Sequence, residues 1–144
     1  MLMEQTPQTA IRTKPTILCV DDHQDSRTLL AFLLAQEGYS VLVAEGFADA
    51  RRLADRVQFD LFILDVRLPD GCGIELCRDL ATLCPGTPVV FCSGLGDDED
   101  IKRAQDAGGA LFLRKPVSPS ELKNAVDDIL AETLGTPQPA SVQA

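Results

Sequence analysis

The sequence predicts an α/β domain built on a doubly wound, parallel sheet of five strands. Five short apolar runs recur along the chain, each continuous rather than alternating, with helical patterns between them. Continuous apolar runs are typical of parallel strands buried on both faces of a sheet. The alternation of strand and helix implies right-handed crossovers that place helices on both sides. The predicted strands are Ile17–Val20, Val41–Ala44, Leu61–Leu64, Val89–Cys92 and Ala110–Leu113.

The first three helices follow from the spacing of their apolar residues and from the residues that end them. The first is predicted over Ser26–Glu37, because its leucines recur on one face and Gly38 can end a helix. The second is predicted over 47–56, and the third over 74–83, ahead of Pro85. These helices connect the first four predicted strands.

The last two helices have recognisable N-terminal residues. The fourth opens with the acidic run 97–100, which suits the positive end of a helix, and ends at Gly108. Its apolar face is thin, so we expect it to be the least firmly packed helix. The fifth begins with Ser118 as N-cap, Pro119 at the first helical position and Glu121 completing a capping box.

Composition limits the classes of protein to consider. A chain of 144 residues is long enough to bury one core. The net charge of -9 argues against binding nucleic acid through the protein's own surface. No apolar run approaches the roughly 20 residues that span a membrane, and the N-terminus lacks a signal-peptide centre. We therefore expect a cytoplasmic protein without membrane contact, with a flexible arm at 1–14, one domain at 15–134, and a tail or linker start at 135–144.

Polar side chains follow four of the predicted strands. Asp21 and Asp22 follow the first, Asp65 the third, Ser93 the fourth and Lys115 the fifth. The carboxyl ends of parallel strands form the edge at which ligands bind, and a carboxylate there is costly without partners. Three neighbouring carboxylates raise each other's pKa unless a cation lies among them. The pattern predicts a site of three acids, one lysine and a divalent metal, Mg²⁺ (or Mn²⁺).

These positions resemble the signature of response-regulator receiver domains of two-component signalling. The matching residues are Asp21-Asp22, Asp65 with Pro69 and Gly73 downstream, Ser93, and Phe112-x-x-Lys115-Pro116. The resemblance covers about residues 15–134 and implies a flavodoxin-like (βα)5 fold with strand order 2-1-3-4-5. Ser93 replaces the commoner threonine but keeps the hydroxyl group.

The resemblance also implies a role for each site residue. Asp65 is the phosphoacceptor, which attacks a phosphohistidine of a sensor histidine kinase or of a histidine phosphotransfer protein. Asp22 and Asp65 ligate the metal directly, Asp21 directly or through water, and the backbone carbonyl of Arg67 completes the set. Lys115 pairs with the phosphoryl oxygens. The domain would catalyse only its own phosphorylation and dephosphorylation, so it is not expected to be an enzyme in the ordinary sense.

A switch follows from the same resemblance. The Ser93 hydroxyl bonds the phosphoryl group, and Phe112 turns inward into the space that Ser93 leaves. This repacks the face made by the fourth helix, the fifth strand and the fifth helix, which an unidentified downstream effector would read. Whether that face also forms a homodimer is left open.

Two other functions remain as alternatives. The first is a scaffold or interaction module that works without phosphorylation. The second is an aspartyl-phosphate phosphatase of the haloacid dehalogenase type, which needs a second aspartate two residues after the nucleophile. Position 67 is arginine and position 23 is histidine, so that motif fails after both Asp65 and Asp21. His23 is expected near the site mouth with no required role, and Arg67 and Leu95 are expected to tune loss of the phosphoryl group.

Overall fold

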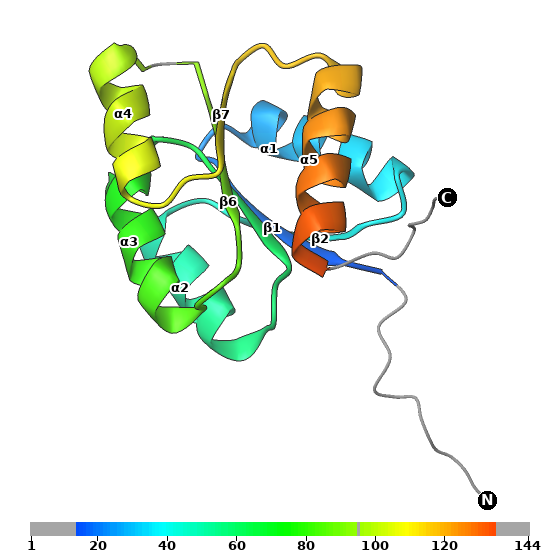
Figure 1. Cartoon of the computed structure of the whole chain (residues 1–144), viewed down its shortest axis with the longest axis horizontal. Helices are drawn as coiled ribbons and strands as arrows, with labels where there is room; N and C mark the ends of the chain where they lie inside the picture. Colours follow the sequence, from blue (N-terminus) through cyan, green and yellow to red (C-terminus); the bar gives the residue numbers. More distant parts are fainter. Residues whose placement is uncertain (1–13, 95, 135–144) are drawn as a thin grey trace, which may run out of the picture.

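A five-stranded parallel sheet lies at the centre of the molecule (Figure 1). The computed structural model describes residues 14–94 and 96–134; the predicted tail and nearly all of the predicted arm, 1–13, lie outside them. The sheet order is β2-β1-β3-β6-β7, which is 2-1-3-4-5 when only its own strands are counted. This confirms the predicted fold class. The sheet strands are β1 Thr16–Val20, β2 Ser40–Ala44, β3 Leu61–Leu64, β6 Val89–Ser93 and β7 Leu111–Arg114.

Five helices cover the two faces of the sheet. Figure 1 shows α1 and α5 on one side and α2, α3 and α4 on the other. The apolar core is divided accordingly into two clusters, one containing Leu34 and Val126 and the other containing Ile74 and Phe91. Each such buried side chain contributes about 1.5–3 kcal/mol to stability. The helices are α1 Gln24–Gln36, α2 Phe47–Arg56, α3 Gly73–Leu83, α4 Asp98–Asp106 and α5 Pro119–Leu134.

Both of the last two helices begin with a side-chain cap, of which the cap at Ser118 was predicted. The side chain of Asp97 accepts a hydrogen bond from the Asp100 backbone N–H at 2.9 Å. Ser118 Oγ accepts one from the Glu121 backbone N–H at 3.1 Å. Ala104 is the buried residue of α4. The loose packing expected of α4 stays a prediction, but this thin buried face is consistent with it.

The outer strands differ from the sequence prediction. The central strands are buried along their length, as continuous apolar runs indicate. In contrast, Val43 of β2 and Leu111 of β7 are exposed, because each lies on an edge strand that the helices cover only in part. The expectation that all five runs are buried on both faces is therefore wrong for the two edges.

A short hairpin occupies the segment after β3, which the sequence predicted as loop. Its strands are β4 Arg67–Leu68 and β5 Gly71–Cys72, paired antiparallel. The side chain of Asp70, between them, accepts hydrogen bonds from the backbone N–H groups of Phe47 and Ala48 at 2.7 and 3.1 Å. The segment leaving the sheet edge is thereby tied to the start of α2. None of the described helices combines the length and apolar character needed to cross a membrane.

Candidate functional site

Residues from four strand ends line one cavity of about 350 Å³ at the carboxyl edge of the sheet. Asp65 and Ser93 are 6% and 1% exposed, and Asp21, which contacts the lining residue Lys115, is 1% exposed. The fold therefore brings the polar residues at the four strand ends together, as the sequence predicts. The lining residues are Asp22, His23, Ser26, Asp65, Arg67, Ser93, Gly94 and Lys115.

Lys115 joins two of the buried carboxylates. Its Nζ lies 2.5 Å from Asp21 Oδ2 and 3.0 Å from Asp65 Oδ2. Burial works against ionisation of Asp21, but hydrogen bonds from Lys115 and Ser26 outweigh it and hold the pKa of Asp21 below its ordinary value. Burial also opposes the charge on Lys115, yet its bonds to both carboxylates raise the pKa of Lys115. The lysine is therefore held as a cation between two anions.

Asp65 is fixed on both oxygens and through its backbone. Ser93 Oγ donates a hydrogen bond to Asp65 Oδ1 at 2.9 Å, while Lys115 approaches Oδ2. The Asp65 backbone N–H donates to the carbonyl of Val20 at 2.9 Å, which continues the pairing of β3 with β1. The carboxylate is thus presented at the tip of a buried strand with a hydroxyl group on one side and an ammonium on the other.

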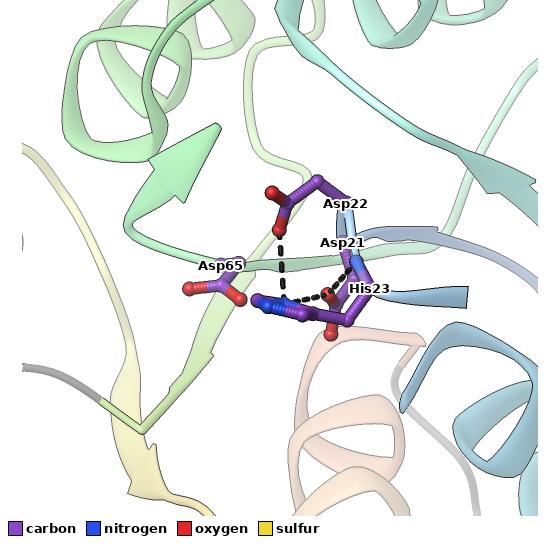
Figure 2. Close-up of side chains that lie close together, drawn as sticks. All are labelled: Asp21, Asp22, His23 and Asp65. Atoms are coloured by element: carbon purple, nitrogen blue, oxygen red, sulfur yellow. Dashed lines mark hydrogen bonds and ion pairs between the residues drawn. The ribbon is translucent and has the colours of Figure 1, made fainter. Parts of the chain in front are cut away.

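The acidic residues fit a divalent cation. One ligand atom from each of Asp21, Asp22, His23 and Asp65 lies within 4.8 Å of the other three (Figure 2). Three carboxylates face one ammonium, so the cluster keeps an excess of negative charge that a cation would balance. Carboxylate oxygens are the donors that Mg²⁺ and Mn²⁺ prefer. Asp22 is the exposed carboxylate of the three, and it lines the same cavity as Arg67.

Sequence reasoning missed two contacts made by the first turn of α1. Ser26 hydrogen-bonds the Asp21 carboxylate, and the Arg27 guanidinium donates to the Asp21 carbonyl oxygen at 2.9 Å. The helix begins at Gln24 rather than at the predicted Ser26, which places this turn directly over Asp21. An acidic strand end followed within a few residues by a helix was the signal available in the sequence.

Phe112 lies outside the cavity. It is half-buried, and its ring stacks on Phe91 with centroids 6.0 Å apart and an interplanar angle of 20°. A Cβ on Gly96, whose φ is +147°, would come within 2.9 Å of the Phe112 ring. Phe112 therefore packs between the core and the segment that connects β6 to α4.

The structure gives a steric reason for glycine at position 73 of the motif. A Cβ at this position would lie 1.9 Å from the carbonyl oxygen of Asp65. The Gly73 backbone N–H also donates to the carbonyl of Val66 at 2.6 Å. Only glycine permits the start of α3 to lie this close to the strand end that carries Asp65. The Lys115–Pro116 peptide bond, on the other side of the site, is cis.

Comparison with known proteins agrees with this geometry. The family model of the response regulator receiver domain matches residues 17–127. The chain is 36% identical over 117 residues to the transcriptional regulatory protein GlrR of Escherichia coli, covering 81% of this chain and 26% of that protein. It is 34% identical over 128 residues to the transcriptional regulatory protein CreB of the same species, covering 88% and 56%.

A solved structure shows the same architecture. The CheY-like receiver domain protein of Methanospirillum hungatei superimposes with a TM-score of 0.83 at 27% identity, covering 87% of this chain and 100% of that one. The sequence relatives are longer, since the matches span 26% and 56% of their length. Receiver domains are signalling domains rather than enzymes in the general case. The chain belongs to the response-regulator receiver domain family of two-component signalling.

Proposed function

We propose that this receiver domain stores a signal as a phosphoryl group on Asp65, taken from a phosphohistidine of a sensor histidine kinase or of a histidine phosphotransfer protein. The observation that carries the proposal is the set of contacts around the Asp65 carboxylate. The Ser93 hydroxyl group donates a hydrogen bond to one carboxylate oxygen, and the Lys115 ammonium donates one to the other. Two further carboxylates lie beside them. That arrangement suits nucleophilic attack followed by charge neutralisation on the new phosphoryl group.

The transfer step needs little covalent work from the protein. A carboxylate oxygen of Asp65 forms a bond to phosphorus as the bond from phosphorus to the donor imidazole nitrogen breaks, and the imidazole leaves with the electron pair. Lys115 keeps its charge and turns from Asp65 toward a phosphoryl oxygen. Ser93, whose hydroxyl group is hydrogen-bonded to Asp65, donates a hydrogen bond to another phosphoryl oxygen.

The residues proposed to hold a cation are those that the family resemblance implies. They are the carboxylates of Asp21, Asp22 and Asp65 and the backbone carbonyl of Arg67. A bound Mg²⁺ (or Mn²⁺) would supply positive charge against the phosphoryl oxygens and hold them in position. The excess of negative charge in the cluster and its oxygen donors support this assignment.

The donor would approach over α1. A groove of about 400 Å³ runs beside the site, and Ser26 and Lys115 line both the groove and the site cavity. Leu29 is 54% exposed at the groove and Phe32, on the same helix, is 57% exposed. An apolar surface that continues into the phosphoacceptor site fits a donor protein whose helix must bring its phosphohistidine to Asp65.

The proposed output is a change on the face of α4, β7 and α5. Ser93 connects Asp65 to β6, and Phe112 on the paired strand β7 contacts the segment leading to α4. A downstream effector protein would read that face; the E. coli relatives are named as transcriptional regulators, which is consistent with such an output.

The NMR signals of the Phe112 ring should shift when a phosphodonor is added. They should shift much less in Ser93→Ala, and an equal shift in both proteins would count against this coupling.

Labelling by a small phosphodonor tests the proposal. Intact-mass spectrometry after incubation with Mg²⁺ and acetyl phosphate should show one added phosphoryl group, absent in Asp65→Asn. Asp60→Asn is a matched control, because Asp60 is also buried but precedes the opposite end of β3, where it accepts a hydrogen bond from the Thr16 backbone N–H. It should label like the wild type. Failure of the wild type to label with this donor and with a cognate kinase would refute the proposal.

A further inference from the structure

The proposed phosphoryl transfer leaves one donor of the site unused, the imidazole of His23. We propose that His23 is an additional metal ligand, so that this receiver holds its cation with a nitrogen atom as well as carboxylate oxygens. The site would then bind Ni²⁺ and related first-row transition metals more tightly than its carboxylates alone can. This inference rests on the proposed metal site and deepens it.

The geometry places the imidazole within the ligand set. His23 Nδ1 lies 3.1 Å from Asp22 Oδ1 and 3.6 Å from Asp21 Oδ1. Two donors that bind one ion at about 2.1 Å can lie at most about 4.2 Å apart, so both pairs already satisfy that limit. Figure 2 shows the ring directed toward both carboxylates, with Asp65 beside it. A shared ion would therefore need side-chain adjustment rather than a new backbone path.

The local backbone explains why the ring is there. The His23 backbone N–H donates to Asp21 Oδ1 at 2.9 Å, which turns the chain back over the carboxylate that precedes it. His23 is then the N-cap residue of α1, with extended backbone angles, and its carbonyl accepts from the Arg27 backbone N–H. Its side chain is 75% exposed, so it does not serve as a core residue. An exposed ion pair with Asp22 is the plainer interpretation, but such pairs contribute only about 0–1 kcal/mol.

The chemistry of the donor decides which metal benefits. Imidazole nitrogen suits zinc, copper, iron and nickel, whereas Mg²⁺ takes oxygen ligands and keeps several waters. Any such site binds Ni²⁺ more tightly than Mn²⁺, so the ranking of metals alone is not diagnostic. The diagnostic quantity is the change that loss of the imidazole causes for Ni²⁺ compared with Mg²⁺.

Calorimetry and electron paramagnetic resonance test the inference on the untagged chain. Titration with NiCl₂ should show the affinity falling about tenfold or more in His23→Asn, while the affinity for MgCl₂ changes by less than about twofold. His23 is the one histidine of the 144-residue sequence, so imidazole nitrogen coupling in the electron spin echo of bound Mn²⁺ can come from no other side chain. That coupling should be present in the wild type and absent in His23→Asn.

The outcomes distinguish failure of the role proposed for His23 from failure of the proposed metal site. Equal Ni²⁺ affinity in wild type and His23→Asn, without nitrogen coupling, would overturn the role of His23 and leave a carboxylate metal site intact. Absence of both Mg²⁺ and Ni²⁺ binding in the wild type would overturn the inference and the proposed metal site together. Asp22→Asn serves as the control for location, because it should weaken binding of both metals.

Discussion

The ammonium of Lys115 lies 3.0 Å from Oδ2 of Asp65, a residue 50 positions earlier in the chain. The two side chains come from the ends of β7 and β3, which do not touch, since β6 lies between them in the sheet. Their contact is therefore a product of the fold as a whole. Because Lys115 also contacts Asp21, one ammonium balances two buried carboxylates.

Replacing Lys115 with methionine should destabilise the metal-free protein by about 2–3 kcal/mol, because two buried carboxylates lose their charged partner. Urea unfolding measures this, and millimolar Mg²⁺ should restore part of the loss by taking over the charge balance. Lys123→Met is the matched control: Lys123 pairs with Asp127 and Glu37 at the surface. Such exposed pairs contribute little. Equal effects of the two substitutions would contradict the assignment.

The contact between Asp21 and Lys115 should make the free energy of unfolding depend on pH. The pKa of Asp21 is lowered on folding, so its contribution is full above its ordinary value of 3.8 and is lost as the pH falls through the folded pKa. The pKa of Lys115 is raised, so its contribution is full below 10.5 and is lost as the pH rises through the folded pKa. Stability should therefore fall more steeply on acidification below about pH 5 in the wild type than in Asp21→Asn. Parallel urea-unfolding curves would contradict this.

Gly73→Ala should damage the site through the backbone. The new Cβ would meet the Asp65 carbonyl oxygen, so the start of α3 or the end of β3 must move, at a loss of about 3 kcal/mol or more. Gly94→Ala is a control from the same cavity, because its Cβ would lie 3.8 Å from Lys115 Cβ, an ordinary van der Waals distance. Thermal unfolding should separate the two variants clearly. A Gly73→Ala protein as stable as Gly94→Ala would show that this close approach is unimportant.

The exposed apolar surface of α1 should affect the rate of phosphoryl transfer from a protein donor but not from acetyl phosphate. Phe32→Ser removes an exposed side chain, so stability should change little. Transfer from a cognate histidine kinase should slow about tenfold or more, because loss of one well-packed aromatic contact costs 1.4 kcal/mol or more at an interface. Labelling by acetyl phosphate should stay at the wild-type rate. Equal slowing with both donors would place the defect in the site instead.

The sequence predicted the fold and most of the site because both depend on strand ends. Continuous apolar runs located the strands, and the polar residues after them had to share one edge. The short hairpin around Asp70 was missed, since its strands are only two residues long and Pro69, Asp70 and Gly71 form the composition of an ordinary loop. The early start of α1 was missed because neither His23 nor Gln24 is a preferred capping residue.

The orientation of His23 was beyond sequence reasoning for a different reason. It depends on a hydrogen bond between its own backbone N–H and the Asp21 side chain, and on how the first turn of α1 lies over β1. The position was predicted at the site mouth, and the structure agrees. That the ring faces two carboxylates follows only from the three-dimensional arrangement.

Locating the phosphoryl group within the chain is the most direct test of the central claim. An aspartyl phosphate is an acyl phosphate, which borohydride reduces to an alcohol, so the acceptor residue becomes homoserine and can be located by peptide mass spectrometry. After incubation with a phosphodonor and Mg²⁺, the converted residue should be Asp65, with Asp21 and Asp22 unchanged. Conversion at another residue, or phosphorylation that persists at full yield in Asp65→Asn, would contradict the account.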